Sequence, residues 1–360
     1  MRSVGIIGAG VVGATIAYEL SKIKGLDITL FEENQEIEGS TRAALGVLVG
    51  ISSQKKKGRA WHLRAESIKR YPSLIKELET LTQSSIAHNP LGLVHLCFSA
   101  ESLAKWQSLQ EFRKDWKLEI WDPKELSEHC PQVESAEIVA GIYSPSDWQI
   151  NPVELTNALN KAAEINGVKL KFGKKITQIV KDEREERIIG VKQEGEFFAL
   201  DHLVIAAGLG STDLTKELTQ NIILQPVLGQ AVHLKLETEI ESSFQPVVTG
   251  NDVHVLPLNQ GEYWVGATVE FPNSNNIPLK PDDQLLESVL YKAFSFYPSL
   301  KQAKILKHWT GYRPRPINLS APIIEKLTGY NNVVLATGHY RNGVLLAPAT
   351  ASIVTKMILE

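Results

Sequence analysis

The sequence predicts an α/β protein in which a domain built on a parallel sheet is interleaved with an α+β domain whose sheet is mainly antiparallel. Two observations indicate the first domain. A strand, a glycine turn, a helix and a second strand fit within residues 4–33, and two later apolar strands also run into glycine-containing loops. A third observation indicates the second domain, because residues 225–270 consist of short β segments separated by glycine and proline.

The elements of the first half follow from apolar spacing. The apolar run 4–7 reads as a buried strand, and the apolar positions from Val11 to Lys22 have helical spacing. Residues 27–33 (DITLFEE) form a second strand that ends in acids. The patterns of residues 61–83 and 99–118 alternate charged and apolar groups at helical spacing, so each predicts a surface helix.

The elements of the second half carry clearer end signals. A helix is predicted from Asn151, which can cap it, through Pro152 at its first position to a stop at Asn166-Gly167. The charged residues 181–187 predict the solvated tip of a hairpin. Two strands that run into glycine loops and a closing helix complete this half, at residues 201–211, 331–343 and 345–359.

The composition is that of a soluble globular protein. Hydrophobic residues make up 43% and charged residues 22% of 360, and the net charge of −3 indicates no nucleic-acid partner. Cys97 and Cys130 have no metal-ligand spacing and suit a reducing compartment, although a bridge between them stays open. We therefore expect no metal site. Glycines interrupt the apolar residues 4–20, so we expect no signal peptide, no membrane span and a cytoplasmic protein.

The glycine turn after the first strand has the spacing of a dinucleotide site. Gly8, Gly10 and Gly13 form G-x-G-x-x-G between a strand and a helix, with Val11 and Val12 inside the motif. Gly8 permits the tight turn, Gly10 lets the backbone approach a pyrophosphate, and Gly13 allows close packing of helix and strand. Amides at the helix start favour the anion. Glu32, followed by Glu33, can accept a hydrogen bond from a ribose hydroxyl.

The segment after the second strand bears on which dinucleotide binds. An NAD dehydrogenase usually continues through further βαβ units, whereas this chain continues with EGSTRAALGVL, residues 38–48. Small and hydroxylated residues there can lie along a long dinucleotide, with Arg42 near its anionic part, which favours FAD. An ordinary Ser/Thr loop remains the alternative. The cofactor contacts expected here are Ser40, Thr41, Arg42, Ala43, Ala44 and Gly46.

Several motifs together resemble one family. GIIGAGVVGATIAYEL, GSTRAALGVL, AAGLGS, VGATVEF, GYRPRP and GHYRNGVLLAPATA are similar to motifs of the D-amino acid oxidase family of FAD-dependent oxidoreductases, and most of all to its glycine oxidases of thiamine biosynthesis. The resemblance covers essentially the whole chain, and the last motif is the most specific. It implies a two-domain flavoprotein that oxidises an amine at the carbon next to a carboxylate.

The resemblance also implies the domains and further cofactor contacts. A discontinuous Rossmann-like FAD-binding domain of glutathione-reductase type is expected at 1–84, 146–220 and 322–360, and the substrate domain at 85–145 and 221–321. Backbone amides near residue 343 are expected to meet the flavin pyrimidine oxygens, with FAD bound non-covalently. The further contacts are Ile176, Ala207, Gly208, Arg313, His339, Arg341, Asn342, Gly343, Val344 and Leu345.

Two arginines suit the carboxylate of an amino acid substrate, because a buried carboxylate needs a permanently charged, bidentate partner. Arg313 in GYRPRP and Arg341 in GHYRNG are each predicted in a turn. The resemblance implies that Arg313 binds the carboxylate and that Arg341 supports it, while a surface ion pair remains the alternative for both. Arg315 is a rival, since the prolines do not decide which arginine points inward. His339 and Tyr340 have either a packing role or a direct one.

The chain departs from glycine oxidases near the substrate. His254 is found where they commonly carry a tyrosine, with Asp252 expected on the same strand face, and Val269 occupies a place where a longer side chain is usual. His254 can bind a carboxylate or a water and is expected to titrate near neutral pH. A core histidine is the alternative reading, and the identity of the substrate stays open among glycine, sarcosine, D-amino acids and cyclic imino acids.

The expected reaction is hydride transfer from the α-carbon of a neutral amine to flavin N5. The imino acid would hydrolyse to a keto acid and ammonia, and O2 would become hydrogen peroxide. No dedicated base is needed if the deprotonated amine binds. Two alternatives are a dehydrogenase that passes electrons to a quinone or protein, and a non-catalytic flavoprotein. The oligomeric state is open, although the family often forms homo-oligomers.

Overall fold

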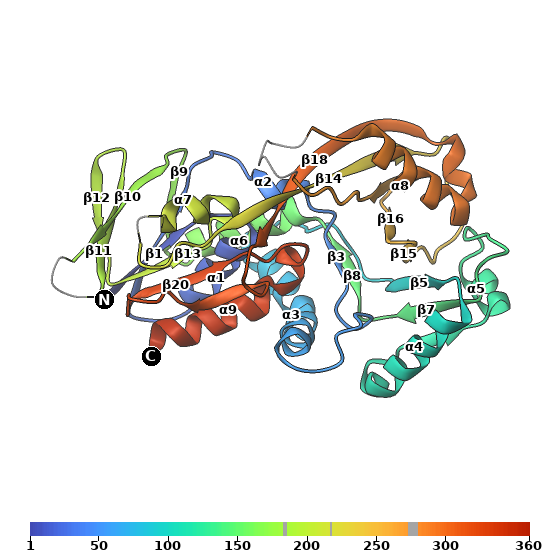
Figure 1. The fold of residues 1–360 in the computed structure, drawn as a ribbon, viewed down its shortest axis with the longest axis horizontal. Coiled ribbons are helices and arrows are strands. Elements are labelled where there is room, and N and C mark those ends of the chain that lie inside the picture. The colour runs from blue at the N-terminus through green and yellow to red at the C-terminus, as the bar shows by residue number, and fades with distance from the viewer. Residues whose placement is uncertain (183–185, 217, 273–279) are drawn as a thin grey trace.

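The structure is a computed structural model, and it describes residues 1–182, 186–216, 218–272 and 280–360 (Figure 1). One half contains a six-stranded sheet in the order β19-β20-β13-β1-β2-β9. All its pairings are parallel except that of β19 with β20, so the predicted parallel sheet is confirmed. Its strands are β1 (Arg2–Ile7), β2 (Leu26–Glu32), β9 (Lys169–Phe172), β13 (His202–Ile205), β19 (Ile323–Lys326) and β20 (Val333–Thr337).

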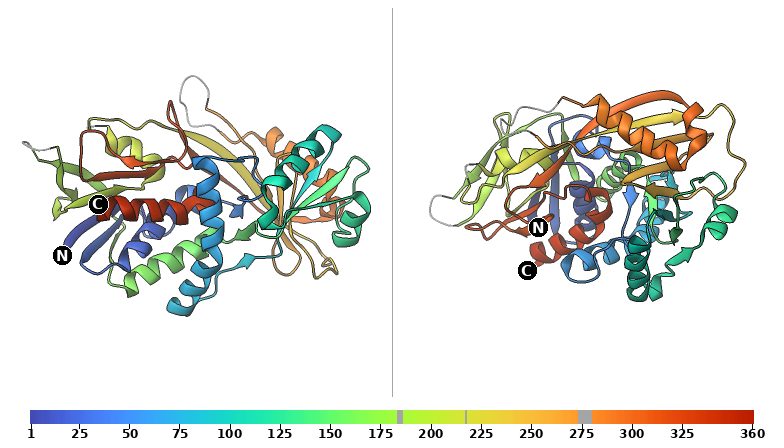
Figure 2. Two further views of the ribbon diagram at one scale, coloured as in Figure 1. Left: turned by 90° about the horizontal axis from the view of Figure 1, so that it is seen from below. Right: turned by 45° about the vertical axis from the view of Figure 1, so that its right-hand side comes forward.

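Four helices pack together beside this sheet, as Figure 2 shows. α1 and α3 each contact both α6 and α9, and their apolar faces form one large core. The capping prediction for α6 is confirmed, because Asn151 Oδ1 accepts from the backbone amides of Val153 and Glu154 at 3.0 and 3.3 Å. The helices are α1 (Val11–Ser21), α3 (Arg59–Thr82), α6 (Pro152–Ile165) and α9 (Gly343–Leu359).

A second core lies between the six-stranded sheet and a small antiparallel sheet of β10 (Ile176–Lys181), β11 (Ile188–Gln193) and β12 (Glu196–Ala199). β10 pairs with β11 on either side of the predicted hairpin tip, of which residues 183–185 lie outside the described residues. The short α7 (Ser211–Thr215) follows β13. The two chain ends lie close together (Figure 1). Arg2 Nη1 donates a hydrogen bond to Ile358 O at 2.7 Å.

The other half contains an eight-stranded sheet in the order β18-β14-β17-β16-β15-β5-β7-β6. Only the pairing of β15 with β5 is parallel, which confirms a mainly antiparallel sheet. The strands are β5 (Leu93–Cys97), β6 (Glu119–Trp121), β7 (Ala140–Ser144), β14 (Leu224–Lys235), β15 (Val247–Gly250), β16 (Val253–Pro257), β17 (Glu262–Gly266) and β18 (Lys304–Pro316). The helices α4 (Ala100–Phe112), α5 (Pro123–His129) and α8 (Asp283–Phe296) accompany it.

The chain crosses between the halves through short elements. β3 (Val47–Leu48), β8 (Trp148–Ile150) and β4 (His88–Asn89) form a small sheet, and α2 (Gly39–Ala43) precedes β3. The long strands β14 and β18 run from one half to the other (Figure 1). The residue boundaries proposed for the two domains stay a prediction.

Two local expectations were wrong. Arg313 lies in the strand β18 rather than in a turn, because β14 pairs with that segment along its length, with Val227 opposite Arg313. Asp252 does not share a strand face with His254, since it lies in the β15–β16 turn with a φ of +63°. Tertiary pairing and a tight turn decided these positions, and neither is visible in the local pattern.

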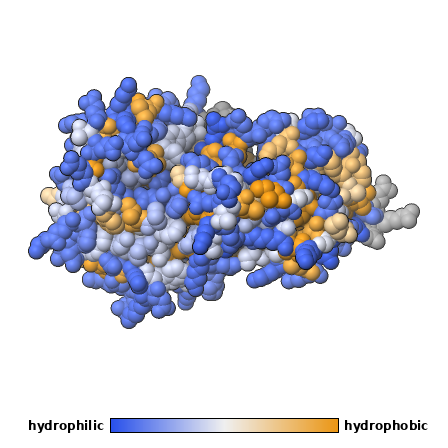
Figure 3. Space-filling view, turned by 180° about the vertical axis from the view of Figure 1, so that it is seen from behind, coloured by the Kyte–Doolittle hydropathy of each residue, from blue (hydrophilic) through white to orange (hydrophobic). Residues whose placement is uncertain are grey.

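The face of the molecule seen from behind is mostly hydrophilic (Figure 3). In the view from behind in Figure 3, hydrophobic residues lie in separate groups between hydrophilic ones. No helix within the described ranges is both long enough and apolar enough to cross a membrane. Cys97 and Cys130 are buried and free, so the bridge that the sequence left open does not form.

Candidate active site

The glycine turn between β1 and α1 has the close contacts that its motif requires. Gly8 has a φ of +102°, and a Cβ there would lie 2.6 Å from Ala206 O. A Cβ on Gly13 would lie 1.8 Å from Gly8 O, so α1 packs directly on the turn. Gly10 caps α1, whose first turn carries no acidic residue. The positive end of the α1 dipole therefore faces the adjoining cavity without a carboxylate from its own first turn.

Glu32 is at the end of β2, beside the glycine turn. Its Oε2 accepts from the amide of Ala9 at 2.8 Å, and its Oε1 accepts from the backbone and side-chain nitrogens of Asn34, both at 3.1 Å. These bonds hold the carboxylate at the rim of the cavity, where the sequence places a ribose contact. The ribose contact itself stays a prediction.

Residues of α2 bring β18 against the N-terminus of α1. Thr41 Oγ1 accepts from the Val11 amide at 3.1 Å, and Ser40 Oγ donates to Tyr312 O at 2.6 Å. Trp309 Nε1 donates to Ala43 O at 3.0 Å. A Cβ on Gly311 would lie 2.1 Å from Ala43 Cβ, so only glycine fits at this crossing.

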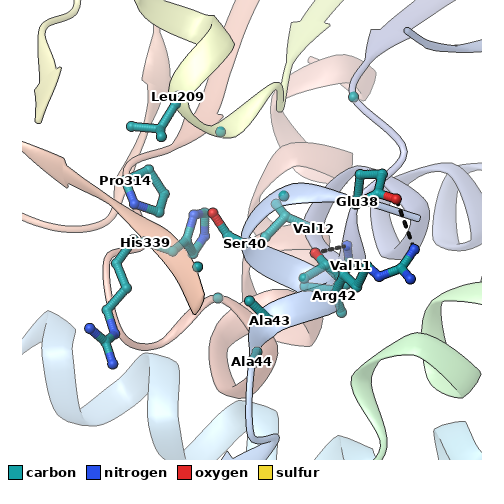
Figure 4. A pocket seen from close by; sticks show the side chains of 18 of the residues that line it. Val11, Val12, Glu38, Ser40, Arg42, Ala43, Ala44, Leu209, Pro314 and His339 are labelled. Carbon is teal, nitrogen blue, oxygen red and sulfur yellow. Dashed lines mark hydrogen bonds and ion pairs between the residues drawn. The ribbon is translucent and has the colours of Figure 1, made fainter. Parts of the chain in front are cut away.

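Figure 4 shows α2 in the wall of the pocket, with Arg42 directed toward Glu38 and away from Pro314 and His339. Arg42 Nη1 lies 2.8 Å from Glu38 Oε1, and the Arg42 side chain is 49% exposed. The structure thus pairs Arg42 with a neighbouring carboxylate at the surface. The pairing uses Nη1 alone, so the contact of Arg42 with the anionic part of a cofactor stays a prediction.

One cavity of about 1930 Å³ extends from the glycine turn to the eight-stranded sheet. Drug-sized ligands occupy pockets of roughly 300–1000 Å³, so this cavity has room for a long dinucleotide and a substrate. Asn160 Oδ1 lies buried on its wall and has no hydrogen-bond partner in the described ranges, which suits a polar ligand. Predicted residues that line it are Gly8, Gly10, Val11, Val12, Glu32, Glu33, Ser40, Thr41, Arg42, Ala43, Ala44, Gly46, Ile176, Ala207, Gly208, His254, Arg313, His339, Arg341, Asn342, Gly343, Val344 and Leu345.

The loop between β20 and α9 closes over the same cavity. Tyr340 has a φ of +55°, and its amide donates to Pro314 O at 3.1 Å, so the loop is fastened to β18. His339 is 4% exposed, with its Nε2 2.9 Å from Thr350 Oγ1. Burial lowers the pKa of His339 to about 3. His339 is thus neutral and fastened to α9, which supports the packing role.

Arg313 points into the cavity, whereas Arg315 does not. The Arg313 guanidinium lies so close to Gly229 that a Cβ there would be 2.3 Å from Nη2, and Nη1 donates to Leu228 O at 3.0 Å. Burial, and then the charge of Arg341, lower the pKa of Arg313. Arg315 is exposed and lies 5.1 Å from the ring centre of Phe271, outside the cavity.

Arg313 and Arg341 form no ion pair with a carboxylate in the described part of the chain. Both line the cavity, and the charge of Arg341 acts on Arg313. Two positive charges therefore face one space, and no carboxylate of the described residues forms an ion pair with either, although the charge of Glu270 acts on Arg313 from further away. This arrangement suits an anionic group supplied by a ligand.

His254 lines the cavity, but its expected titration near neutral pH was wrong. Burial, followed by the charge of Arg341, lowers the pKa of His254 to about 4, so the imidazole is neutral at pH 7. Its Nδ1 lies 2.8 Å from Thr249 Oγ1. Asp252 also lines the cavity, and its charge favours the protonated form, but less strongly than burial opposes it.

Sequence reasoning missed His95, Thr249, Trp309 and Asn160, which also line the cavity. His95 lies in an apolar strand and Asn160 within an amphipathic helix, so each resembles an ordinary packing residue. A polar side chain in an otherwise apolar strand was the one available signal for His95. The others become visible only when the sheets are assembled.

The fold and this site define a protein with a dinucleotide-type glycine turn and one cavity that runs from this turn to Arg313 and Arg341. The family model described as FAD dependent oxidoreductase, DAO, matches residues 3–357, and the chain belongs to this family. FAD is therefore its cofactor. The close glycine turn, the α1 N-terminus and the unpartnered Asn160 oxygen fit such a ligand.

Relatives support the same assignment. A bifunctional ThiO/ThiG protein of Nostoc sp. is 28% identical over 100% of this chain and 53% of its own length. A glycine oxidase of Bacillus subtilis is 26% identical over 99% of this chain and 92% of that protein. The chain thus spans about half the length of the ThiO/ThiG relatives.

Solved structures show the same fold. A glycine oxidase of Bacillus cereus has a TM-score of 0.87 at 23% identity, covering 100% of this chain and 95% of that chain. An L-proline dehydrogenase of P. horikoshii has a TM-score of 0.86 at 23% identity, covering 99% of this chain and 93% of that chain. At these identities the likeness concerns the fold and not the substrate.

Proposed function

We propose that this protein is a FAD-dependent amino acid oxidase that oxidises a small amino acid at its α-carbon and reduces O2 to hydrogen peroxide. The observation that carries the proposal is the pair Arg313 and Arg341, which face the cofactor cavity without a carboxylate partner among the described residues. Relatives named glycine oxidase support it, at 26% identity over nearly the whole chain.

The residues that would hold FAD come from three elements. The glycine turn and the α1 N-terminus would take the pyrophosphate, α2 would lie along the middle of the molecule, and the start of α9 would meet the flavin. When bound there, FAD would supply the acceptor for the hydride and the route by which O2 would take up the electrons. Neither helix start carries an acidic residue in its first turn, so both favour negative charge.

Arg313 would bind the substrate carboxylate. Its guanidinium is held by Leu228 O and confined by Gly229, so the side chain is ordered before substrate arrives. Arg341 would supply a second charge from the β20–α9 loop. Two cations beside the substrate lower the pKa of its ammonium group, which favours the neutral amine that can release a hydride. The site then needs no strong base.

The test is an anaerobic screen of small amino acids and amines with FAD-loaded protein, followed by admission of air. Flavin absorbance should fall with at least one compound, and hydrogen peroxide and a keto acid should then form. Bleaching without peroxide would contradict the oxidase proposal and assign the electrons to another acceptor. Absence of bleaching by every small amino and imino acid would contradict the enzyme proposal as a whole.

A further inference from the structure

A chain of hydrogen bonds leads from a buried carboxylate to the substrate end of the cavity. Asp147 is fully buried, and its oxygens accept from the amides of Gly50, Ile51 and Ser52, each at 2.8 Å. Ser52 Oγ also donates to Asp147 Oδ2. The same hydroxyl lies 2.8 Å from Nε2 of His95, whose ring lines the cavity.

These hydrogen bonds determine which nitrogen of His95 carries the proton. Three backbone amides and the Ser52 hydroxyl donate to the Asp147 oxygens. Burial raises the pKa of Asp147, but these hydrogen bonds oppose it and favour the carboxylate, which only accepts. Ser52 has one hydroxyl proton, which goes to Asp147. Its oxygen must therefore accept from His95 Nε2–H, and Nδ1 of the neutral ring keeps a lone pair.

The Nδ1 atom of His95 is available to a ligand. It has no hydrogen-bond partner among the described residues, and the atom is not sealed from solvent. The Trp106 ring lies against the imidazole at 5.0 Å between ring centres. Burial lowers the pKa of His95 to about 3, so the lone pair stays unprotonated at neutral pH.

His95 lies in line with the other polar groups of the site. Thr249 pairs with His95 on one neighbouring strand and with His254 on the other, so the three side chains form a row across β5, β15 and β16. The charges of Arg341 and Arg313 act on His254 from the next elements, with that of Asp252 opposing them. The row is therefore a neutral, hydrogen-bonding wall beside the two cations.

We propose that this row is an amine subsite, in which His95 Nδ1 accepts a hydrogen bond from the substrate N–H while Arg313 holds the carboxylate. Asp147 and Ser52 are positioning residues that keep His95 in the accepting tautomer. This inference rests on the proposed function, since it assumes an amino acid substrate. An acceptor that takes up no proton can hold a neutral amine without adding a third cation beside Arg313 and Arg341.

The first test reads the tautomer without using activity. In FAD-loaded protein with ¹⁵N-labelled histidine, two-bond ¹H–¹⁵N spectra should show Nε2–H on His95, identified by loss of its signals in His95→Gln. Asp147→Asn would present an amide donor to Ser52, so Ser52 would donate to Nε2 and the tautomer should change to Nδ1–H. A wild-type Nδ1–H tautomer, or an unchanged tautomer in Asp147→Asn, would overturn the assignment.

Because Asp147 also holds three backbone amides, its variant can fail to fold. Ser52→Ala removes only the hydroxyl and should abolish the preference for Nε2–H. Ser53→Ala is the matched control, since Ser53 lies in the same loop and its hydroxyl bonds to the Lys55 amide instead. The His95 spectrum of Ser53→Ala should match that of the wild-type protein. A Ser52→Ala spectrum identical to that of the wild-type protein would overturn the role of the Ser52 hydroxyl.

The second test separates amine from carboxylate recognition. His95→Phe keeps a ring but removes the acceptor, so the affinity for the bleaching amino acid should fall about tenfold, the size of one net hydrogen bond. Binding of acetate, which has no amine, should stay within about twofold. An equal loss for both ligands, or none for the amino acid, would overturn the amine subsite alone. Wild-type protein that no amine bleaches would instead overturn the proposed function and the amine assignment with it.

Discussion

Arg313 reaches the cavity because the residue beside it has no side chain. Gly229 lies on β14 next to the strand that carries Arg313, and a Cβ at Gly229 would overlap the guanidinium. Arg315, two residues further along β18, is exposed and lies over Phe271. The two arginines share a sequence context and differ only in what lies opposite them.

Replacing Arg313 with alanine should weaken substrate binding by roughly 10- to 100-fold, because a charged hydrogen bond contributes about 1.5–3 kcal/mol. Lysine should restore the binding only in part, since it lacks the bidentate fork. The measurement is the amino acid concentration that half-reduces the flavin without oxygen.

Arg315→Ala is the matched control for this change, and it should bleach at the wild-type concentration. If Arg315→Ala loses affinity and Arg313→Ala does not, the carboxylate site is wrongly assigned.

Three histidines with lowered pKa values predict how stability depends on pH. Burial lowers the pKa of His95 and His339 to about 3 and of His254 to about 4, against 6.5 for an exposed histidine. Below pH 6.5 these histidines bind protons in the unfolded chain but stay neutral in the folded chain, so acid favours unfolding. The free energy of unfolding should be independent of these groups above pH 6.5 and should fall between pH 6.5 and 4.

Urea unfolding at pH 7, 6 and 5 measures this dependence. In the steep part of the range the fully buried His339 should contribute about 1.4 kcal/mol per pH unit. His339→Gln should remove that share of the slope. Stability that rises on acidification from pH 7 to 5 would contradict the neutral state of these side chains in the folded protein.

At the scale of single elements, the crossing of α2 and β18 controls the site. Gly311 lies against Ala43, and the two hydrogen bonds of Ser40 and Trp309 fasten the same crossing. Arg313 follows only two residues later. The position of the carboxylate-binding residue therefore depends on how closely β18 can approach the cofactor-binding half.

Gly311→Ala should destabilise the protein by about 1–3 kcal/mol, as overpacking does, and should lower FAD affinity. Ala43→Gly removes the atom that the new Cβ would meet, so the double variant should recover most of the loss. Thermal unfolding and FAD titration of the single and double variants measure this. A double variant as unstable as Gly311→Ala would show that the two residues do not interact.

The regular elements were predictable where end signals were strong. The Asn151-Pro152 start and Asn166-Gly167 stop predicted α6 to within about two residues, because capping is local chemistry. The sequence predicted a turn around Arg313, where the structure has the strand β18. Strand pairing with β14 overrode that local preference, since both prolines take extended backbone within β18.

At the scale of the whole molecule, the cavity joins both sheets, so cofactor binding should stabilise both. FAD present at 100 times its Kd should raise the free energy of unfolding by about 2.7 kcal/mol. We expect a single thermal transition that moves upward with FAD concentration. Gly13→Ala should remove most of this shift, because its Cβ would lie 1.8 Å from Gly8 O and the turn would have to open.

The apo form of Gly13→Ala serves as its own reference in that experiment. Two separate transitions, of which FAD moves only one, would contradict the coupling of the halves through the cavity.

The sequence by itself determined a dinucleotide site and the parallel and antiparallel sheets, because glycine spacing, caps and apolar periodicity are local properties. The family resemblance added FAD and the cofactor contacts near residue 343, and the predicted residues make up only part of the cavity lining. Only the tertiary structure decided that Arg313 faces the cavity while Arg315 faces solvent, and that His254 is neutral. Only the tertiary structure places Asp147, Ser52 and His95 in one series of hydrogen bonds. Orientation and pKa depend on what lies opposite a side chain, and residues distant in the chain supply those neighbours.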